Sequence, residues 1–227
     1  MRILAIDTAL DACSAAVLDT HRGGILASET LPMTRGHAEA VMPLIARVMD
    51  QAGIEFRDLD RIAVTVGPGS FTGLRVGISA ARGIALAAGK PAIGLTTLVG
   101  FAAPHIASDD ARPVVSAIDA RHDHVYLQVF GGGGRTVIPP KLASLREAVR
   151  TAIAGPARVV GSAAELIASL WPKAEPPPAL VDQRGAPDIA WIAQLGVAAA
   201  VASDPPKPLY LRAPDAQPQD AARLPRR

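Results

Sequence analysis

The residues most able to do chemistry lie in a glycine-rich stretch over 67–75, Gly-Pro-Gly-Ser-Phe-Thr-Gly-Leu-Arg. This stretch follows an apolar run and precedes a helical pattern. Its backbone N–H groups and the positive end of the helix dipole could therefore bind an anion together. The hydroxyls of Ser70 and Thr72 and the guanidinium of Arg75 add further donors. The candidate contacts to a phosphate or nucleotide are Gly69, Ser70, Phe71, Thr72 and Arg75.

The same stretch departs from the established nucleotide-binding motifs. A P-loop requires lysine and then serine or threonine after its last glycine, whereas Leu74 and Arg75 follow Gly73 here. The dinucleotide-binding motif requires glycine where this chain has Thr72. Two interpretations stay open at this point: a phosphate contact, or a tight strand-to-helix turn in which Ser70 or Thr72 caps the helix.

Two aspartates end the first predicted strand of each half of the chain, Asp7 after the run 3–6 and Asp119 after the run 114–118. Both could face a cleft between two lobes. Carboxylates in such a cleft can hold a metal-bound phosphate, which gives one hypothesis: an enzyme that uses Asp7, Asp119 and the glycine-rich turn on Mg·ATP. Turn and cap residues are the equally open alternative for both aspartates.

The histidines and the single cysteine form no recognisable catalytic or metal-binding set. His37 begins a helical pattern, but Val41 stands where a His-x-x-x-His metal pair needs its second ligand. His122 and His124 are expected on one face of a strand, without a third ligand. Cys13 forms neither an internal disulfide nor a Cys-based zinc site, and we expect it to be buried and inert. We therefore predict no catalytic and no metal-binding residues, which also argues against a peptidase.

The elements that position these residues follow a mixed α/β order. Short apolar runs between turn-forming residues predict strands, and apolar residues at three- and four-residue steps predict helices. In the first half, the predicted strands cover 3–6, 14–18, 24–31, 61–66 and 92–95, and the helices cover 37–52 and 72–88. In the second half, the predicted strands cover 114–118, 124–130, 158–160 and residues near 180, and the helices cover 142–153, 163–170 and 188–202.

The second half partly repeats the order of the first, which predicts two related α/β lobes. The N-terminal lobe is expected over 1–107 and the C-terminal lobe over 108–212, with a polar boundary near 108–113. The last helix is free to pack back onto the first lobe. A flexible tail rich in proline and arginine is expected over 213–227.

The predicted helix over 72–88 is rich in glycine and alanine. Gly73 and Gly77 share one face, and Ala80 and Ile84 share another. Glycine inside a helix costs up to ~1 kcal/mol relative to alanine, so several glycines indicate a close backbone approach. The spacing leaves open whether the helix presses on its own sheet or on a partner helix.

Composition excludes several classes of protein. Hydrophobic residues make up 49% of the 227 residues and charged residues 19%, which excludes a chain that is disordered throughout. A net charge of +2 excludes a strongly basic nucleic-acid binder. The apolar run 76–88 is interrupted by Arg82, and the first residues lack the order of a signal peptide. We therefore expect a cytoplasmic protein without a membrane segment.

Five stretches together resemble the bacterial TsaB (YeaZ) family. They are Ile-Leu-Ala-Ile-Asp-Thr at 3–8, Arg-Gly-His-Ala-Glu at 35–39, the glycine-rich block at 66–75, Asp-Ala-Arg at 119–121 and Pro-Leu-Tyr-Leu-Arg at 208–212. The block at 66–75, followed by a small-residue helix, is the most specific of them. The resemblance implies a two-lobed, actin-like fold of the ASKHA (ribonuclease H-like) type, with mixed sheets flanked by helices.

The resemblance also implies a function. TsaB-like proteins act in making N6-threonylcarbamoyladenosine (t6A) next to the anticodon of tRNAs that read codons starting with A. A related catalytic protein, TsaD, transfers the threonylcarbamoyl group, and TsaB-like proteins pair with it, with the ATPase TsaE joining them. The chain is then a non-catalytic scaffold that forms a homodimer in isolation and meets tRNA only indirectly. No tightly bound cofactor is implied, and ATP or ADP at the TsaB–TsaD interface would meet the glycine-rich turn.

TsaB-like proteins pair through the helices of the first lobe, which implies where the interface lies. The implied interface residues are His37, Val41, Leu44, Ile45, Val48, Gly73, Gly77, Ala80, Ala81 and Ile84. On this basis Gly77→Leu or Ala81→Leu is expected to abolish pairing while the monomer still folds.

Overall fold

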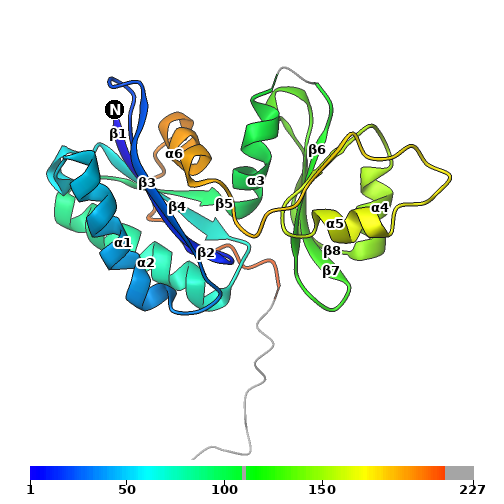
Figure 1. Cartoon of the computed structure of the whole chain (residues 1–227), viewed down its shortest axis with the longest axis horizontal. Helices are drawn as coiled ribbons and strands as arrows, with labels where there is room; N and C mark the ends of the chain where they lie inside the picture. The colour runs from blue at the N-terminus through cyan, green and yellow to red at the C-terminus, as the bar shows by residue number, and fades with distance from the viewer. Residues whose placement is uncertain (109–110, 213–227) are drawn as a thin grey trace, which may run out of the picture.

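The computed structural model describes residues 1–108 and 111–212, and it contains two five-stranded sheets (Figure 1). The first sheet has the order β3-β2-β1-β4-β5, in which β1, β2 and β3 are antiparallel and β1, β4 and β5 are parallel. Its strands are β1 (Arg2–Asp7), β2 (Ala12–Asp19), β3 (Gly24–Pro32), β4 (Arg61–Gly67) and β5 (Ala92–Thr96). The apolar runs of β1 and β2 are buried on both faces, as continuous rather than alternating apolar residues predict.

The second sheet repeats this topology, with the order β10-β9-β6-β7-β8. Here β6, β7 and β8 form the antiparallel part, and β9 and β10 run parallel to β6. The strands are β6 (Val114–Asp119), β7 (His124–Phe130), β8 (Thr136–Ser144), β9 (Arg158–Val160) and β10 (Leu180–Asp182). The two sheets are therefore copies of one arrangement.

One strand of the second sheet was not predicted. β8 contains Pro139 and Pro140, which obscure a strand pattern and are tolerated here because β8 lies at the edge of its sheet. The predicted helix over 142–153 therefore begins too early. The Ser144 side chain accepts a hydrogen bond from the Glu147 N–H, so α4 begins only at Leu145.

The helices and sheets form five layers (Figure 1). Two long helices cover the outer face of the first sheet, two helices lie between the sheets, and two short helices cover the outer face of the second. In that order they are α1 (His37–Ala52) and α2 (Phe71–Ala88), α3 (Thr97–Ile106) and α6 (Ile189–Ala198), and α4 (Leu145–Ala152) and α5 (Ala164–Ser169). Short 3-10 helices cover Phe56–Asp58 and Gly132–Gly134. None of the described helices is long and apolar enough to cross a membrane.

The last helix follows the second lobe in sequence but packs on the first. Ile192 and Ala193 of α6 contact the apolar face of the first sheet, around Ile3 and Ala63. The Arg61 guanidinium donates to backbone carbonyls at the end of α6, among them Ala199 O at 2.9 Å, and so stabilises the helix C-terminus. This helix ends at residue 198, earlier than the predicted 202, and the predicted tail over 213–227 lies outside the described residues.

Residues 201–212, here called the C-terminal segment, continue along the first lobe. Pro206 is buried, and the Leu209 N–H donates to Val66 O at 2.7 Å. At its end the Arg212 guanidinium donates to Ala120 O of the second lobe at 3.4 Å. The segment therefore connects the ends of the parallel strands of the first sheet to the β6–β7 turn.

Candidate functional site

The glycine-rich turn is packed against the β1–β2 turn. The Ser70 N–H donates to Ala9 O at 2.7 Å, and a Cβ at Gly69 would lie 2.4 Å from that oxygen. The Ser70 hydroxyl accepts from the Gly73 N–H at 3.3 Å, which makes Ser70 the cap of α2. Two of the N–H groups that could have held an anion are thus paired within the chain. The capped turn is present, and the phosphate contact stays a prediction.

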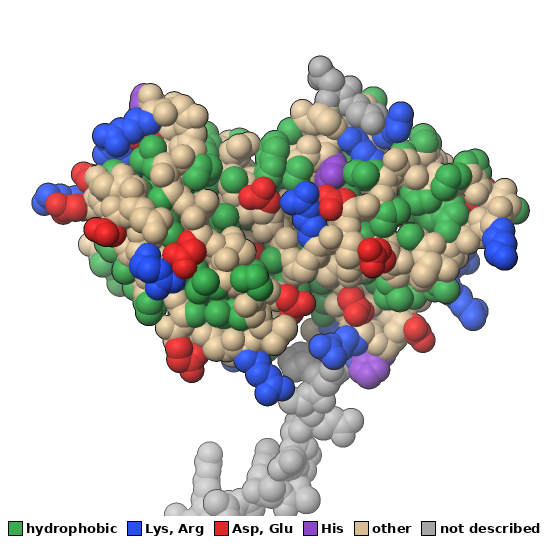
Figure 2. Space-filling view, in the orientation of Figure 1, with side chains coloured by type: hydrophobic (Ala, Val, Ile, Leu, Met, Phe, Trp, Pro, Cys, Tyr) green, Lys and Arg blue, Asp and Glu red, His purple; other side chains and the backbone are tan. Residues whose placement is uncertain are grey.

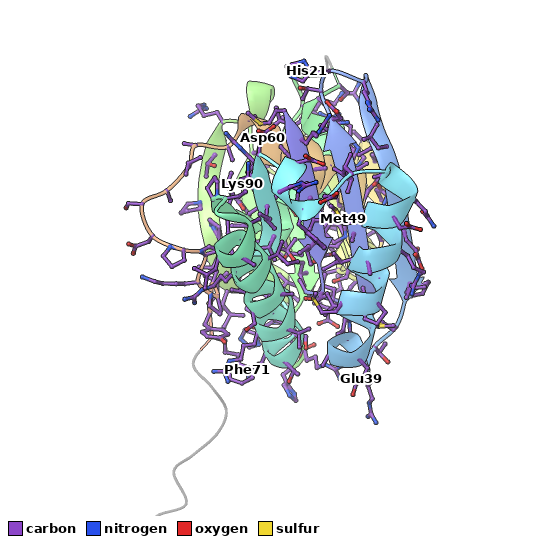
Figure 3. All side chains as sticks on the ribbon, turned by 90° about the vertical axis from the view of Figure 1, so that its left-hand side faces the viewer. His21, Glu39, Met49, Asp60, Phe71 and Lys90 are labelled. Atoms are coloured by element: carbon purple, nitrogen blue, oxygen red, sulfur yellow. The ribbon has the colours of Figure 1, made fainter. Side chains whose placement is uncertain are left out.

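An aromatic cluster lies at the first turn of α2, where Figure 3 labels Phe71. The rings of Phe71 and Tyr210 stack with their centroids 5.4 Å apart. The Arg75 guanidinium lies 3.8 Å from the Phe71 centroid, and its Nε donates to the Tyr210 hydroxyl at 3.1 Å. We call Phe71, Arg75 and Tyr210 the aromatic cluster. Tyr210 was missed as a site residue, because it lies 135 positions from Arg75 and spacing along the sequence does not reveal contacts between such distant residues.

A cleft of about 560 Å³ lies between the two lobes. It brings the glycine-rich turn close to the end of β6, since Ser70 and Asp119 both line it. Asp119 is exposed, as predicted, and its Oδ1 accepts from the Arg121 N–H at 2.7 Å. The cleft is lined by Leu10, Asp11, Thr34, His37, Gly69, Ser70, Ile118, Asp119, Ala120, Arg121, Tyr126, Ser162, Gln183 and Gly185.

Asp7 does not face the cleft, contrary to the prediction. Its side chain is fully buried, and its Oδ1 accepts hydrogen bonds from the Thr65 hydroxyl and the Ala9 N–H. Strand register explains the enclosure, because Thr65 and Ser14 flank Asp7 on the neighbouring strands. Burial raises the pKa of the Asp7 carboxyl above its ordinary value. The group is therefore an enclosed structural carboxyl, not an open ligand for a metal-bound phosphate.

The histidines and the cysteine also have structural surroundings. His37 is nearly buried, with its Nε2 at 3.1 Å from Leu10 O. His122 lies in the β6–β7 turn at a φ of 52°, so it does not share a strand face with His124, contrary to the prediction. Burial raises the pKa of the Cys13 thiol to about 11, which keeps the thiol protonated and unreactive. Among the described residues, no three His, Cys, Asp or Glu side chains gather in a way that could hold a metal.

Most of the implied interface residues face the interior of the first lobe. A Cβ at Gly77 would lie 2.3 Å from the Thr8 Oγ1, and one at Gly73 would lie 2.1 Å from the Thr8 O. The close approach indicated by the glycines is therefore made to the chain's own β1–β2 turn. The buried positions are His37, Val41, Leu44, Ile45, Val48, Gly73, Gly77, Ala81 and Ile84, and pairing through this set stays a prediction.

The outer side of the same two helices carries an apolar groove of about 440 Å³, here called the α1–α2 groove. Met42 and Phe56 are its exposed walls, with 47% and 37% of their surface accessible. Gly83 forms part of its floor, and a Cβ there would meet nothing within 4 Å. The groove is lined by Met42, Phe56, Arg57, Ser79, Ala80, Gly83, Ile84, Ala87 and Ala88, so only Ala80 and Ile84 of the implied interface line it.

Three residues of the groove, Met42, Phe56 and Gly83, were missed as site residues; they lie on the layer formed by α1 and α2, which faces the viewer in Figure 3. The available signal was the exposed side of each helical pattern, on which Met42 and Gly83 stand among polar or small neighbours.

Comparisons with known proteins agree with this architecture. A family model described as TsaD, tRNA N6-adenosine threonylcarbamoyltransferase, matches residues 15–186. The tRNA threonylcarbamoyladenosine biosynthesis protein TsaB of Escherichia coli is 40% identical over 126 residues, covering 56% of this chain and 53% of that protein. An uncharacterized protein of Mycobacterium tuberculosis is 34% identical over 221 residues, covering 95% of this chain and 94% of that protein.

A solved structure supports the fold directly. YeaZ from Pseudomonas aeruginosa matches with a TM-score of 0.76 at 27% identity, covering 92% of this chain and 99% of that chain. The predicted fold class, two actin-like lobes with mixed sheets flanked by helices, is confirmed. The chain spans about half the length of the TsaB proteins of Escherichia coli and Haemophilus influenzae that it matches.

Proposed function

The chain belongs to the TsaB (YeaZ) family, within the wider group that the TsaD family model describes, and on this premise we propose that it is a non-catalytic subunit in t6A formation. In this role it pairs with a TsaD-like transferase that modifies the adenosine next to the anticodon of tRNAs reading codons that start with A. A TsaE-like ATPase joins the pair.

The α1–α2 groove is the observation that carries this proposal. Exposed apolar side chains that line a groove are typical of a protein interface, because a partner removes them from water. A second copy of this chain supplies an apolar surface of the same kind, and we expect the outer helices of a related TsaD-like subunit to do so as well. We therefore assign heterodimerisation to this groove, and homodimerisation when the TsaD-like subunit is absent.

The surroundings of Asp7 support catalytic silence. An enzyme of the phosphotransfer type needs an ionised carboxylate that reaches a metal in the cleft. Asp7 is fully buried, its Oδ1 accepts hydrogen bonds from Thr65 and Ala9, and it does not line the inter-lobe cleft. One observation supports the alternative function, an ATP hydrolase or phosphotransferase that acts on its own: Asp119 lines the cleft between the lobes.

The glycine-rich turn fits poorly as a nucleotide contact. The Ser70 N–H and hydroxyl are both used within the chain, and Arg75 is engaged by Phe71 and Tyr210. We therefore propose no ATP or ADP contact at this turn.

The test is reconstitution of tRNA modification with the TsaD-like subunit, followed by mass spectrometry of the nucleosides. We expect no t6A from this chain alone and t6A when both subunits are present. Asp7→Asn and Asp119→Asn are expected to retain activity within about twofold, because no catalytic carboxylate is removed. A loss of a hundredfold or more in both variants, with folding intact, would favour the enzyme alternative.

A cellular experiment tests the same proposal. Depletion of the protein is expected to lower the t6A content of bulk tRNA. Unchanged t6A after depletion would contradict the assignment to this pathway.

A further inference from the structure

The aromatic cluster presents two large rings to solvent beyond the α1–α2 groove. Phe71 is 48% exposed and Tyr210 is 44% exposed, although aromatic residues are only 4% of the chain. The rings stack on each other, and Arg75 fixes both by lying over Phe71 and donating to the Tyr210 hydroxyl. A pair of rings held in this way is a rigid, exposed platform.

The surroundings of the platform are polar and carry both basic and acidic side chains. The contact between Arg212 and Ala120 O places the C-terminal segment against the β6–β7 turn. Arg121, in that turn, lines the same cleft as Ser70, which precedes Phe71. The Arg121 side chain is exposed and makes no hydrogen bond or ion pair with any described residue. Figure 2 shows Lys and Arg side chains and a histidine at the lower edge of the two lobes, with acidic side chains nearby.

The chemistry of this surface differs from that of the α1–α2 groove. Protein partners bury exposed rings within apolar surroundings, as the groove provides with Met42, Phe56 and Ile84. Exposed rings beside arginines are instead suited to unpaired nucleic-acid bases, which stack on the rings while their phosphates approach the cations. Asp119 and Asp123 in the same turn repel phosphates, so a strand would follow the rim of the cleft at Arg121 rather than enter the cleft.

We propose that the aromatic cluster, together with Arg121, is a binding surface for unpaired RNA, on which a base stacks against Phe71 or Tyr210. This inference rests on the proposed function, since that function brings a tRNA with an unpaired anticodon loop to the complex. It goes beyond the expectation that the chain meets tRNA only indirectly, because the chain itself then contacts the RNA.

The test is fluorescence anisotropy of the full chain with a labelled RNA hairpin that has an unpaired loop, and with a blunt RNA duplex. The hairpin is expected to bind more tightly than the duplex. Tyr210→Ala is expected to weaken hairpin binding by about 5- to 100-fold, the loss typical of one stacked base. Tyr210→Phe keeps the ring and is expected to retain binding. Arg121→Gln is expected to lower the salt dependence (log affinity against log salt) by about 0.7, as for one phosphate contact on a single strand.

Phe56→Ala is the matched control, because it removes an exposed ring from the α1–α2 groove instead of the platform. With this chain alone, in the absence of the TsaD-like subunit, it is expected to leave hairpin affinity within about twofold. Equal affinity of wild type and Tyr210→Ala, with and without the TsaD-like subunit, would overturn the inference. So would a Tyr210→Ala variant that loses the TsaD-like subunit but keeps RNA affinity, since the cluster would then be a protein contact.

The two levels of the proposal can fail separately. If depletion lowers t6A while Tyr210→Ala binds the hairpin normally, only the RNA surface is wrong. If depletion leaves t6A unchanged while hairpin binding depends on Tyr210, the RNA surface stands and the pathway assignment fails.

Discussion

The two faces of α2 carry glycines with opposite environments. On the inner face, a Cβ at Gly77 would lie 2.3 Å from the Thr8 Oγ1, so the position is filled by the chain itself. On the outer face, a Cβ at Gly83 would meet nothing within 4 Å. Glycine inside a helix therefore indicates an external partner only where the chain's own atoms leave the space open.

The largest effect is expected from Gly77→Leu. The new side chain would collide with Thr8 and Val64 inside the lobe, and overpacking of this kind costs about 1–3 kcal/mol or more. We expect the protein to lose stability by at least that amount, measured as a lower midpoint of urea unfolding by circular dichroism. This revises the expectation that Gly77→Leu leaves the monomer folded. A variant that unfolds at the wild-type midpoint would show that the inner face is not tightly packed.

Gly83→Leu should instead leave the fold intact and weaken pairing. The side chain projects into the α1–α2 groove, where it obstructs a partner, and the expected loss of affinity for the TsaD-like subunit is about 10- to 100-fold. Isothermal titration calorimetry measures the loss, and sedimentation measures any effect on self-association.

The control for this prediction is Ser169→Leu, which adds apolar bulk to an exposed position on α5 of the other lobe. It is expected to leave pairing unchanged. Wild-type affinity of Gly83→Leu would mean that the groove is not the docking surface.

Thr8→Val tests the inner face by removing a hydrogen bond. The Thr8 hydroxyl donates to Gly73 O at 2.7 Å in a buried position, and loss of such a bond costs about 1–2 kcal/mol. Unfolding in urea is expected to occur at lower concentration, while affinity for the TsaD-like subunit is unchanged. Thr8→Ser, which keeps the hydroxyl, should lose less stability. Equal urea-unfolding midpoints for wild type and Thr8→Val would show that this hydrogen bond does not stabilise the packing of α2.

Gly83→Ala should give the smallest effect, and in the opposite direction. Alanine is favoured over glycine inside a helix by up to ~1 kcal/mol, and at this position it meets no neighbour. The unfolding free energy is expected to rise by about that amount. A loss of stability would show that the backbone here is constrained in a way that the helix geometry does not reveal.

The sequence was sufficient to predict the residue range of α2, but not which face of the helix packs on the sheet. The glycine-rich turn and Gly89 predicted a helix over 72–88, and the structure has Phe71–Ala88. Which face meets the sheet could not be predicted, because both faces carry small residues. The orientation of α2 depends on its contact with Thr8, whose hydroxyl donates to Gly73 O. Thr8 is brought to α2 because β1 pairs with β4, the strand that precedes this helix. β8 was missed for a related reason, since its prolines are compatible with a strand only at a sheet edge.

The site was predicted less completely than the fold. The sequence offered Ser70 as one of two possible caps of α2 and Asp119 as a possible cleft residue, and both lie there. Asp7 could not be distinguished from Asp119 by pattern, because its enclosure depends on Thr65 from a distant strand. Tyr210 was visible only as part of a family motif, and its stacking on Phe71 required the return of the C-terminal segment to the first lobe.

That return has a consequence for how the molecule can be made. The first lobe is discontinuous in sequence, since α6 covers Ile3 and Ala63, and the Leu209 N–H pairs with Val66 O. While the chain emerges from the ribosome, the apolar surface that α6 will cover stays open until the whole second lobe has been synthesised. The early half of a nascent chain is therefore a candidate for chaperone protection, and expressing that half alone would yield a lobe with one face uncovered.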